Sequence, residues 1–311
     1  MVGRTKRFFT LNNGNSIPAI TTVGVGNKWT KIYGIRDGAK NLMEYLKEIL
    51  ALPGFLHIMT AEFYPNNGLL SAALKASQKP RHEIWITDKY CSQCKLSSSP
   101  IEALERSLDR LGFDYVDLYL IHNPCLDSSP NGISLEKAWK QMELLYKTGK
   151  VKNIGVSNFR IEDLERLKDA EIKPQVNEIE FHAFLQNQTP NIYEYAKTHD
   201  LLLCGYSPLF PLETKTEDFM DFPFYRYIIG LAEKYNKTEA QILLHWMNCL
   251  GVLPVITNTK VKWYKEASDI ISFELTSEEL DMITELGKKH KPHRKHFVKE
   301  YMKYNSEAHI A

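Results

Sequence analysis

Three side chains that can donate or accept a proton each stand at or near the end of a short, strand-like run. Tyr64 ends HIMTAEFY, Lys89 lies in IWITDKY and His122 ends VDLYLIH. Reduction of a carbonyl needs such groups, because the alkoxide that develops must receive a proton. Each residue alone is explained equally well as a loop aromatic, a solvated strand end or a core histidine. Together they predict a site for proton transfer.

The three runs belong to a series of eight strand-like segments separated by helical stretches. The segments cover residues 21–26, 57–63, 84–90, 116–122, 152–158, 175–181, 201–208 and 253–259. Strands that are apolar almost throughout and alternate with helices indicate a parallel sheet that is covered on both faces. Eight such α/β units close into a (β/α)8 or TIM barrel, in which the carboxyl ends of neighbouring strands meet. We therefore expect the three side chains to lie close together.

Two of the intervening helices have clear boundaries. Ser99 is placed to cap a helix that has Pro100 in its first turn, Glu102 at the capping-box position and Gly112 as its end. The segment 134–149 repeats this pattern, with apolar residues at helical spacing. Both helices are expected to pack on the sheet.

The organisation of the rest of the chain indicates a single domain over residues 1–311. Asn13-Gly14 between extended stretches predicts a β-hairpin at about residues 8–20, followed by the barrel at about 21–287 and a tail, 288–311, over the active-site face. A doubly wound dinucleotide-binding fold is disfavoured. Its Gly-x-Gly-x-x-Gly fingerprint is incomplete in GVGNKW, residues 24–29.

Composition and charge favour a small-molecule partner over nucleic acid or a membrane. The 311 residues carry 39 lysines and arginines against 38 aspartates and glutamates, so the net charge is close to zero. No signal peptide or membrane span is evident, and we expect a cytoplasmic protein. The five cysteines are expected to be reduced thiols. Cys91 and Cys94 lack the companions of a zinc site, so no metal is expected.

From about residue 8 to residue 290 the chain resembles the aldo-keto reductases, and within them the fungal branch that reduces α-keto amides and conjugated polyketones. The motifs that carry the resemblance are HIMTAEFY, ITDKY, DYVDLYLIHNP, GKVKNIGVSNF, PQVNEIEFHAFLQNQ and GYSPL. It implies an NADPH-dependent carbonyl reductase in which Tyr64 donates the proton, Lys89 assists it and His122 orients the carbonyl. Elementary chemistry agrees, because a nearby ammonium makes a phenol a better proton donor.

The resemblance also implies residues for the cofactor and the substrate. The substrate is expected to be an activated ketone or aldehyde, such as an α-keto amide, ester or lactone. Its pocket is expected to include Trp29, Phe210, His296 and Phe297. The residues implied for the cofactor are Ser157, Asn158 and Glu178 at the nicotinamide carboxamide, Tyr206 against the nicotinamide ring, Ser207 and Leu209 at the pyrophosphate, and Thr257, Asn258, Thr259 and Lys260 at the phosphate.

Several positions depart from the family pattern, among them Leu69, Ser71 and Phe210, and three further departures bear directly on the expected site. Met59 stands where the family has an aspartate beside the lysine, Glu178 replaces a glutamine, and Trp263 replaces an arginine. Asp88 is next to Lys89, but strand alternation points it away from the barrel interior. A second hypothesis is therefore a weakened or silent barrel that binds nucleotide or a partner. An aldolase-type use of Lys89 as a Schiff-base nucleophile is a third, and it leaves Tyr64 unexplained.

Overall fold

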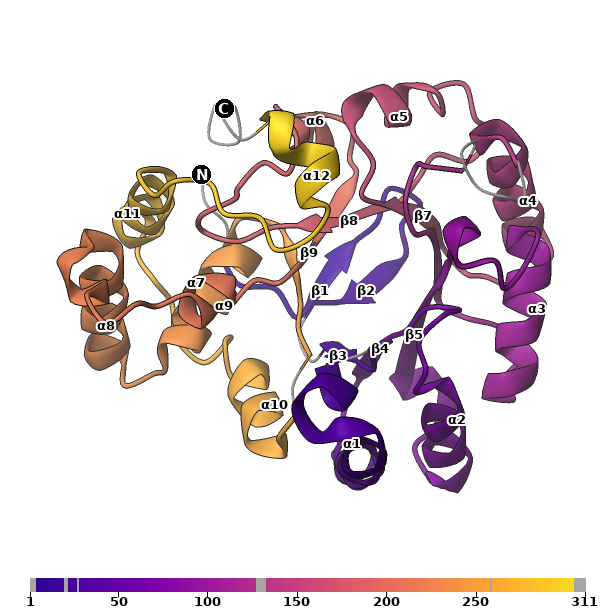
Figure 1. The fold of residues 1–311 in the computed structure, drawn as a ribbon, viewed down its shortest axis with the longest axis horizontal. Coiled ribbons are helices and arrows are strands. Elements are labelled where there is room, and N and C mark those ends of the chain that lie inside the picture. Colours follow the sequence, from indigo (N-terminus) through magenta and orange to yellow (C-terminus); the bar gives the residue numbers. More distant parts are fainter. Residues whose placement is uncertain (1–3, 20–21, 27, 127–132, 258, 305–311) are drawn as a thin grey trace. The chain divides into compact units, whose positions relative to one another are not determined.

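The structure is a computed structural model that describes residues 4–19, 22–26, 28–126, 133–257 and 259–304. Eight strands lie in one sheet in chain order, from β3 to β10, and alternate with helices (Figure 1). Each strand from β3 to β6 pairs in parallel with the next, as do β9 and β10. This confirms the predicted (β/α)8 barrel. The strands are β3 (Thr22–Gly24), β4 (Leu56–Met59), β5 (Ile84–Tyr90), β6 (Leu118–Ile121), β7 (Ile154–Ser157), β8 (Val176–Glu180), β9 (Leu202–Tyr206) and β10 (Leu253–Val255).

The chain divides into two compact units. Unit 1 comprises Met1–Ile20, Glu178–Ile256 and Lys265–Ala311, and unit 2 comprises Thr21–Asn177 and Thr257–Tyr264. The three candidate catalytic residues all belong to unit 2. The expected cofactor and substrate residues are divided between the two units.

Unit 2 contains the helices that follow β3 to β7, and their ends obey the capping signals in the sequence. The Ser99 hydroxyl accepts a hydrogen bond from the Glu102 backbone N–H at 3.3 Å, and Gly112 ends the helix with a φ of 71°. The Glu102 carboxylate bonds to Ser98, one residue before the cap, because its Oε2 accepts from the Ser98 N–H at 2.8 Å. The helices are α1 (Lys28–Leu50), α2 (Asn67–Ala76), α3 (Pro100–Leu111), α4 (Leu135–Lys147) and α5 (Ile161–Glu165), with short 3₁₀ turns η1 (Arg81–Glu83) and η2 (Ser92–Cys94).

Unit 1 begins with the predicted hairpin of β1 (Phe8–Thr10) and β2 (Ser16–Pro18). Gly14 adopts a φ of 86° in its turn, a conformation that side chains with a Cβ rarely take. Asn248 on a later helix holds the hairpin segment, since it accepts from the Lys6 N–H at 2.7 Å and donates to the Lys6 carbonyl oxygen at 3.0 Å. These contacts fix the N-terminal segment within unit 1.

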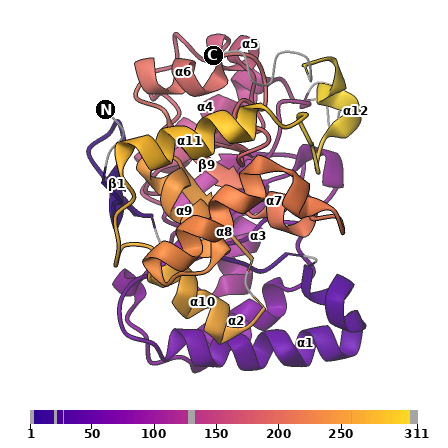
Figure 2. The same ribbon diagram turned by 90° about the vertical axis from the view of Figure 1, so that its left-hand side faces the viewer.

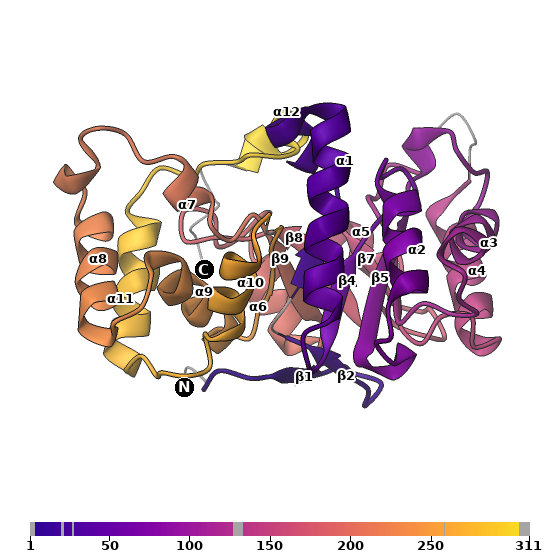
Figure 3. The same ribbon diagram turned by 90° about the horizontal axis from the view of Figure 1, so that it is seen from below.

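The outer helices of unit 1 form a connected layer. The Lys234 ammonium on α8 donates to the Glu279 carboxylate of α11 at 2.7 Å, and the Trp246 indole of α9 donates to Thr284 of α11 at 2.9 Å. Figures 2 and 3 show these helices side by side. The helices of unit 1 are α6 (Ile192–Thr198), α7 (Phe210–Glu213), α8 (Pro223–Tyr235), α9 (Glu239–Cys249), α11 (Ser277–Lys288) and α12 (Val298–Tyr301), with η3 (Phe219–Asp221) and η4 (Met302–Tyr304); α10 (Val261–Ser268) begins in unit 2.

The cysteines differ from the sequence-based expectation in one place. Cys91 and Cys94 form a disulfide, whereas Cys125, Cys204 and Cys249 do not. The two sulfurs meet because the chain makes a tight 3₁₀ turn directly after β5, which the Cys-x-x-Cys spacing allows. In the described parts of the chain, no cluster of three or more histidine, cysteine or acidic side chains suits a metal ion. No described helix is long and apolar enough to cross a membrane.

Candidate active site

Tyr64 lies in the loop between β4 and α2. Although β4 ends at Met59, the chain stays attached to β5, because the Thr60 N–H donates to the Thr87 carbonyl oxygen at 2.8 Å and the Glu62 N–H donates to the Lys89 carbonyl oxygen at 3.1 Å. The loop that carries the phenol is therefore held in register with the strand that carries the lysine.

Two asparagines that our sequence analysis did not single out secure the same loop. The Asn66 amide donates to the carbonyl oxygens of Val25 at 2.9 Å and Gly26 at 3.0 Å, and the Asn67 amide donates to the Ala61 carbonyl oxygen at 2.8 Å. The tyrosine ring packs against Gly26, since a Cβ there would lie 3.4 Å from its ring carbons. The two asparagines at the start of α2 were the available signal for these roles.

Lys89 is buried on β5, with 1% of its surface exposed. Its Nζ donates a hydrogen bond to the Thr60 carbonyl oxygen at 3.3 Å. Asp88 faces the other side, as strand alternation predicts. Burial raises the pKa of the Asp88 carboxyl, and the Ser107 hydroxyl, the Lys89 backbone N–H, the Lys89 ammonium and the Arg110 guanidinium oppose that shift. The Asp88 carboxyl therefore lies at the interface with α3 and also acts electrostatically on Lys89.

Met59 shares a face of the sheet with Lys89. The His57 imidazole is 2.8 Å from the Thr87 hydroxyl across β4 and β5, so these two residues point to the same side. Because side chains on one side recur every second residue, Met59 and Lys89 lie on that side as well. Met59 is 2% exposed. A buried thioether thus occupies the position from which a carboxylate would meet the ammonium.

His122 follows the last residue of β6 and is neutral near pH 7. Burial, and secondly the Lys89 ammonium, lower the pKa of the His122 imidazole to about 3. Its Nδ1 is buried and has no hydrogen-bond partner among the residues that the structure describes. The ring is therefore an uncharged group with hydrogen-bonding capacity left for another molecule.

The Phe63 ring packs against the rings of both Tyr64 and His122. Its ring centroid lies 5.0 Å from that of Tyr64 and 5.3 Å from that of His122. Lys89 acts electrostatically on His122 and bonds to Thr60 of the Tyr64 loop. The structure thus brings all three candidate catalytic residues together in unit 2.

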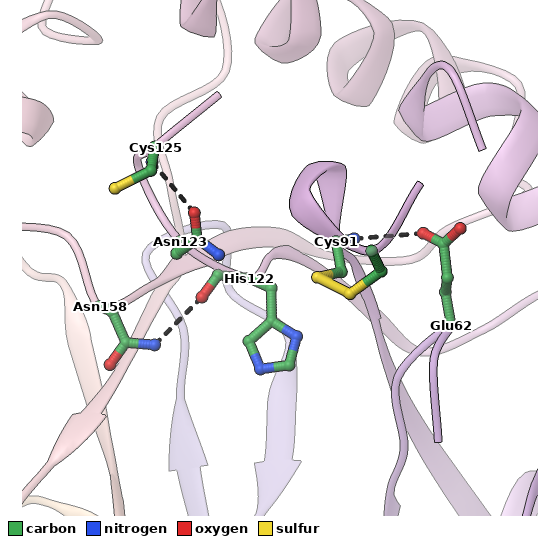
Figure 4. The surroundings of a disulfide bond; sticks show 7 residues. Glu62, Cys91, His122, Asn123, Cys125 and Asn158 are labelled. Atoms are coloured by element: carbon green, nitrogen blue, oxygen red, sulfur yellow. Dashed lines mark hydrogen bonds between the residues drawn. A yellow bond between two sulfur atoms is a disulfide. The ribbon is translucent and has the colours of Figure 1, made fainter. Parts of the chain in front are cut away.

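The expected carboxamide-binding residues of unit 2 lie next to the histidine. Ser157 and Asn158 are buried where β7 ends. The Asn158 amide donates to the His122 carbonyl oxygen at 3.0 Å, as Figure 4 shows, and to the Ser157 hydroxyl at 3.0 Å. Asn158 adopts a φ of 61°. This left-handed turn, which asparagine tolerates, directs the chain away from the strand at the site.

The expected phosphate-binding residues follow β10. Thr259 is buried, Thr257 is half-buried and Lys260 is exposed. The Lys260 ammonium lies 4.9 Å from the ring centroid of Trp263, which is itself exposed. The Trp263 ring therefore packs against the Lys260 ammonium, so a cation remains beside the position at which the family has an arginine. Asn258 and the side chain of Trp29 lie outside the described part of the structure.

Unit 1 holds the remaining expected cofactor residues on β8 and between β9 and α7. Glu178 is buried in the middle of β8, Tyr206 ends β9, and Ser207 and Leu209 lie in the segment before α7. The Tyr206 hydroxyl donates to Gln188 Oε1 at 3.4 Å. Burial, and secondly Glu180, raise the pKa of the Tyr206 phenol well above its ordinary value. The Tyr206 phenol is therefore protonated and uncharged near neutral pH.

The C-terminal tail is fixed to β8 by Glu180, a buried residue that our sequence analysis missed. Its carboxylate accepts the backbone N–H groups of Lys295 at 2.7 Å and His296 at 3.1 Å. The Arg294 guanidinium donates to the Gln188 carbonyl oxygen at 2.7 Å. No local pattern predicts these bonds, because they join residues more than a hundred positions apart.

This anchoring places the expected pocket residues of the tail. The His296 ring meets Tyr206 edge to face, with 5.4 Å between centroids. Phe297 has a φ of 49° and lies 5.9 Å from the ring of Tyr301. Phe210 is buried near His293, 4.8 Å away. Unit 1 therefore presents aromatic and imidazole groups beside the end of β9.

Comparisons with protein families, with individual proteins and with solved structures all point to the same family. The model of the aldo/keto reductase family matches residues 39–288. An NADPH-dependent alpha-keto amide reductase of Saccharomyces cerevisiae is 52% identical over 302 residues, which cover 96% of this chain and 97% of the relative. An NAD/NADP-dependent indole-3-acetaldehyde reductase of Schizosaccharomyces pombe is 36% identical, and the alignment covers 92% of this chain and 96% of the relative.

Solved structures show the same likeness. An aldo/keto reductase of Brucella melitensis superposes with a TM-score of 0.72 at 32% identity, covering 90% of this chain and 98% of that chain. A Bombyx mori aldo-keto reductase in complex with NADP superposes with a TM-score of 0.77 at 27% identity, covering 96% and 98%.

Proposed function

Because the chain belongs to the aldo/keto reductase family, we propose that it reduces an activated ketone or aldehyde to the alcohol in an NADPH-dependent reaction. The candidate substrate classes are α-keto amides, esters and lactones, the first of which matches the printed name of the yeast relative. The observation that carries the proposal is the connected group of Tyr64, Lys89 and His122 in unit 2.

In this proposal Tyr64 donates the proton from its hydroxyl group to the developing alkoxide. The Lys89 ammonium stabilises the phenolate that Tyr64 leaves behind, since an opposite charge favours the ionised form. The two are held in register by the backbone bonds between residues 60–62 and β5. Such preorganisation avoids a rearrangement during the reaction.

His122 orients the substrate. A neutral imidazole can donate one hydrogen bond to the carbonyl oxygen, and the low pKa of His122 keeps it neutral throughout the range in which the enzyme would work. Because the ring does not ionise there, it positions the carbonyl and leaves proton donation to Tyr64.

The donor set suits a phosphorylated nicotinamide nucleotide. NADPH, when bound, supplies the hydride. Hydroxyls and an ammonium suit its phosphates, an amide suits its carboxamide, and a neutral aromatic ring suits its nicotinamide. The residues proposed for these roles are Ser157, Asn158, Thr257, Asn258, Thr259 and Lys260 in unit 2 and Tyr206 and Ser207 in unit 1. Unit 1 also contributes Glu178, whose carboxylate can accept from the carboxamide, and Leu209 beside the pyrophosphate.

We propose that Trp29, Phe210, His296 and Phe297 contact the substrate. The anchoring of the tail to Glu180 supports this role for His296, because two hydrogen bonds hold its backbone segment at the end of β8. An imidazole beside aromatic rings suits a polar carbonyl that carries an adjacent acceptor group.

A second candidate function is a barrel that binds nucleotide but turns over slowly or not at all. The buried Met59 favours it, because a thioether gives the neighbouring ammonium neither a charge nor a good acceptor. We further propose that residues 1–311 act as one domain in the cytoplasm. The three cysteines outside the disulfide are compatible with a compartment that keeps thiols reduced, whereas a disulfide such as Cys91–Cys94 is uncommon there.

The test is the absorbance of NADPH when the purified protein meets a panel of α-keto amides, α-keto esters, lactones and unactivated ketones. We expect consumption with the activated carbonyls and little with the others. Tight nucleotide binding without consumption on any member of the panel would favour the silent barrel.

A further inference from the structure

The Cys91–Cys94 pair lies directly after β5, two residues beyond Lys89. The Cα atoms are 5.5 Å apart, which is within the range that a disulfide requires. The Cys94 N–H donates to the Cys91 carbonyl oxygen at 3.1 Å, so the bond closes a single 3₁₀ turn. The bond can therefore form or break with a rearrangement of this turn alone.

We propose that Cys91 and Cys94 form a reversible redox site that exchanges with low-molecular-weight disulfides such as glutathione disulfide, and that the oxidised form is the faster reductase. The exchange goes beyond the proposed function, whereas the effect on turnover rests on it.

The two sulfurs differ in access. Cys91 is buried, with 6% exposed, and Cys94 is half-buried. The Cys94 thiolate attacks one sulfur of the small disulfide, forms a mixed disulfide and releases one thiolate, which takes up a proton. The Cys91 thiolate then attacks the sulfur of Cys94 and expels the second small thiolate. Two protein thiols are oxidised, and one small disulfide is reduced to two thiols.

Glu62 is the group that links this site to the catalytic loop. Its Oε2 accepts the Cys91 N–H at 3.2 Å, and its buried Oε1 has no partner among the described residues. Figure 4 shows the Glu62 carboxylate hydrogen-bonded to the backbone N–H of Cys91, one of the two disulfide residues.

The same residue transmits the redox state. The Glu62 backbone bonds to the Lys89 carbonyl oxygen, and Tyr64 follows two residues later. On reduction the two sulfurs must separate to non-bonded distance. Because Cys91 is buried and Cys94 is half-buried, we expect Cys94 to be the residue that moves. Opening the turn weakens the Cys91–Glu62 bond and loosens the Tyr64 loop. Since small displacements of catalytic groups are costly, we expect a kcat that is about threefold or more lower in the reduced form.

The exchange is tested with the folded, full-length protein in a series of glutathione buffers, followed by rapid alkylation and mass spectrometry. As the buffer becomes more oxidising, we expect the Cys91 and Cys94 thiols to become protected from alkylation together, in one two-electron step. A Cys125→Ser variant, which lacks the exposed thiol of the next loop, is the matched control and should titrate identically. In Cys91→Ser, glutathione should be trapped on Cys94, whereas Cys94→Ser should trap little on buried Cys91.

Two results would overturn the exchange: both thiols remaining alkylatable in the most oxidising buffer, or two independent one-thiol steps. The coupling is tested by kcat at saturating NADPH. The oxidised protein should exceed the reduced protein, and Cys94→Ser should have the reduced-form value under both conditions. Equal kcat values in the two forms would contradict the coupling. Absence of activity in both forms would contradict the proposed function and leave the thiol titration intact.

Discussion

Lys89 donates from its Nζ to the backbone carbonyl oxygen of Thr60, 3.3 Å away and one residue beyond Met59. A carbonyl dipole therefore satisfies part of the hydrogen-bonding capacity of an ammonium that is almost fully buried. A dipole stabilises a charge less than a carboxylate does. We therefore expect the identity of residue 59 to affect the rate of catalysis.

Met59→Asp is expected to raise kcat about tenfold, which corresponds to about 1.4 kcal/mol of the activation barrier. The carboxylate would stand on the same side of the sheet as the ammonium. Met59→Leu, which keeps the volume and adds no charge, is the control. The melting temperatures of both variants should be recorded, because a buried aspartate without partners costs stability. A folded aspartate variant with unchanged or lower kcat would show that residue 59 does not limit turnover.

His122 should make the free energy of unfolding depend on pH. Its folded pKa of about 3 lies below the ordinary value of 6.5, so the unfolded chain takes up a proton first as the pH falls. This contribution to stability is complete above pH 6.5 and is lost toward pH 3, with a slope of up to about 1.4 kcal/mol per pH unit.

Urea unfolding of wild type and His122→Gln at pH 7 and pH 5 measures this effect. Wild type should lose about 2 kcal/mol more than the variant over this interval. Identical losses would mean that the imidazole is not held neutral by the fold.

Lys260→Met should weaken NADPH binding about fivefold and leave NADH binding unchanged, because the ammonium is expected to pair with the 2′-phosphate at a solvent-exposed site. Fluorescence titration with each nucleotide gives the two Kd values. Lys47→Met, which removes an exposed lysine from α1, is the control. An equal change in both Kd values would place Lys260 away from the 2′-phosphate.

Glu180→Ala should release the tail and raise KM for the carbonyl substrate about tenfold, while the Kd of NADPH stays within about twofold. Two backbone N–H groups lose a charged acceptor, and such bonds contribute about 1.5–3 kcal/mol. Limited proteolysis near residue 295 should become faster. Glu194→Gln, which alters an exposed carboxylate, is the control. Unchanged KM together with faster proteolysis would show that the tail does not contact the substrate.

The fold was predictable because its signals are local. Alternating apolar runs, the Ser99 cap and Asn13-Gly14 each report on a few neighbouring residues, and the structure follows them. The attachment of Glu180 to the tail and of Asn66 to Val25 joins distant segments, so no short pattern carries it. The Cys91–Cys94 disulfide was misjudged for a different reason. Its spacing is local, but whether the thiols are joined depends on the turn that follows β5.

The most direct test of the account is the rate at which the purified protein consumes NADPH on an α-keto amide, measured for wild type and Tyr64→Phe. The account predicts measurable turnover by wild type, a loss of about 10²–10⁴-fold in the variant, and an unchanged Kd for NADPH, because only the proton donor is removed. A variant that reduces the α-keto amide at near the wild-type rate would contradict the assignment of Tyr64 as the acid and the mechanism built on it.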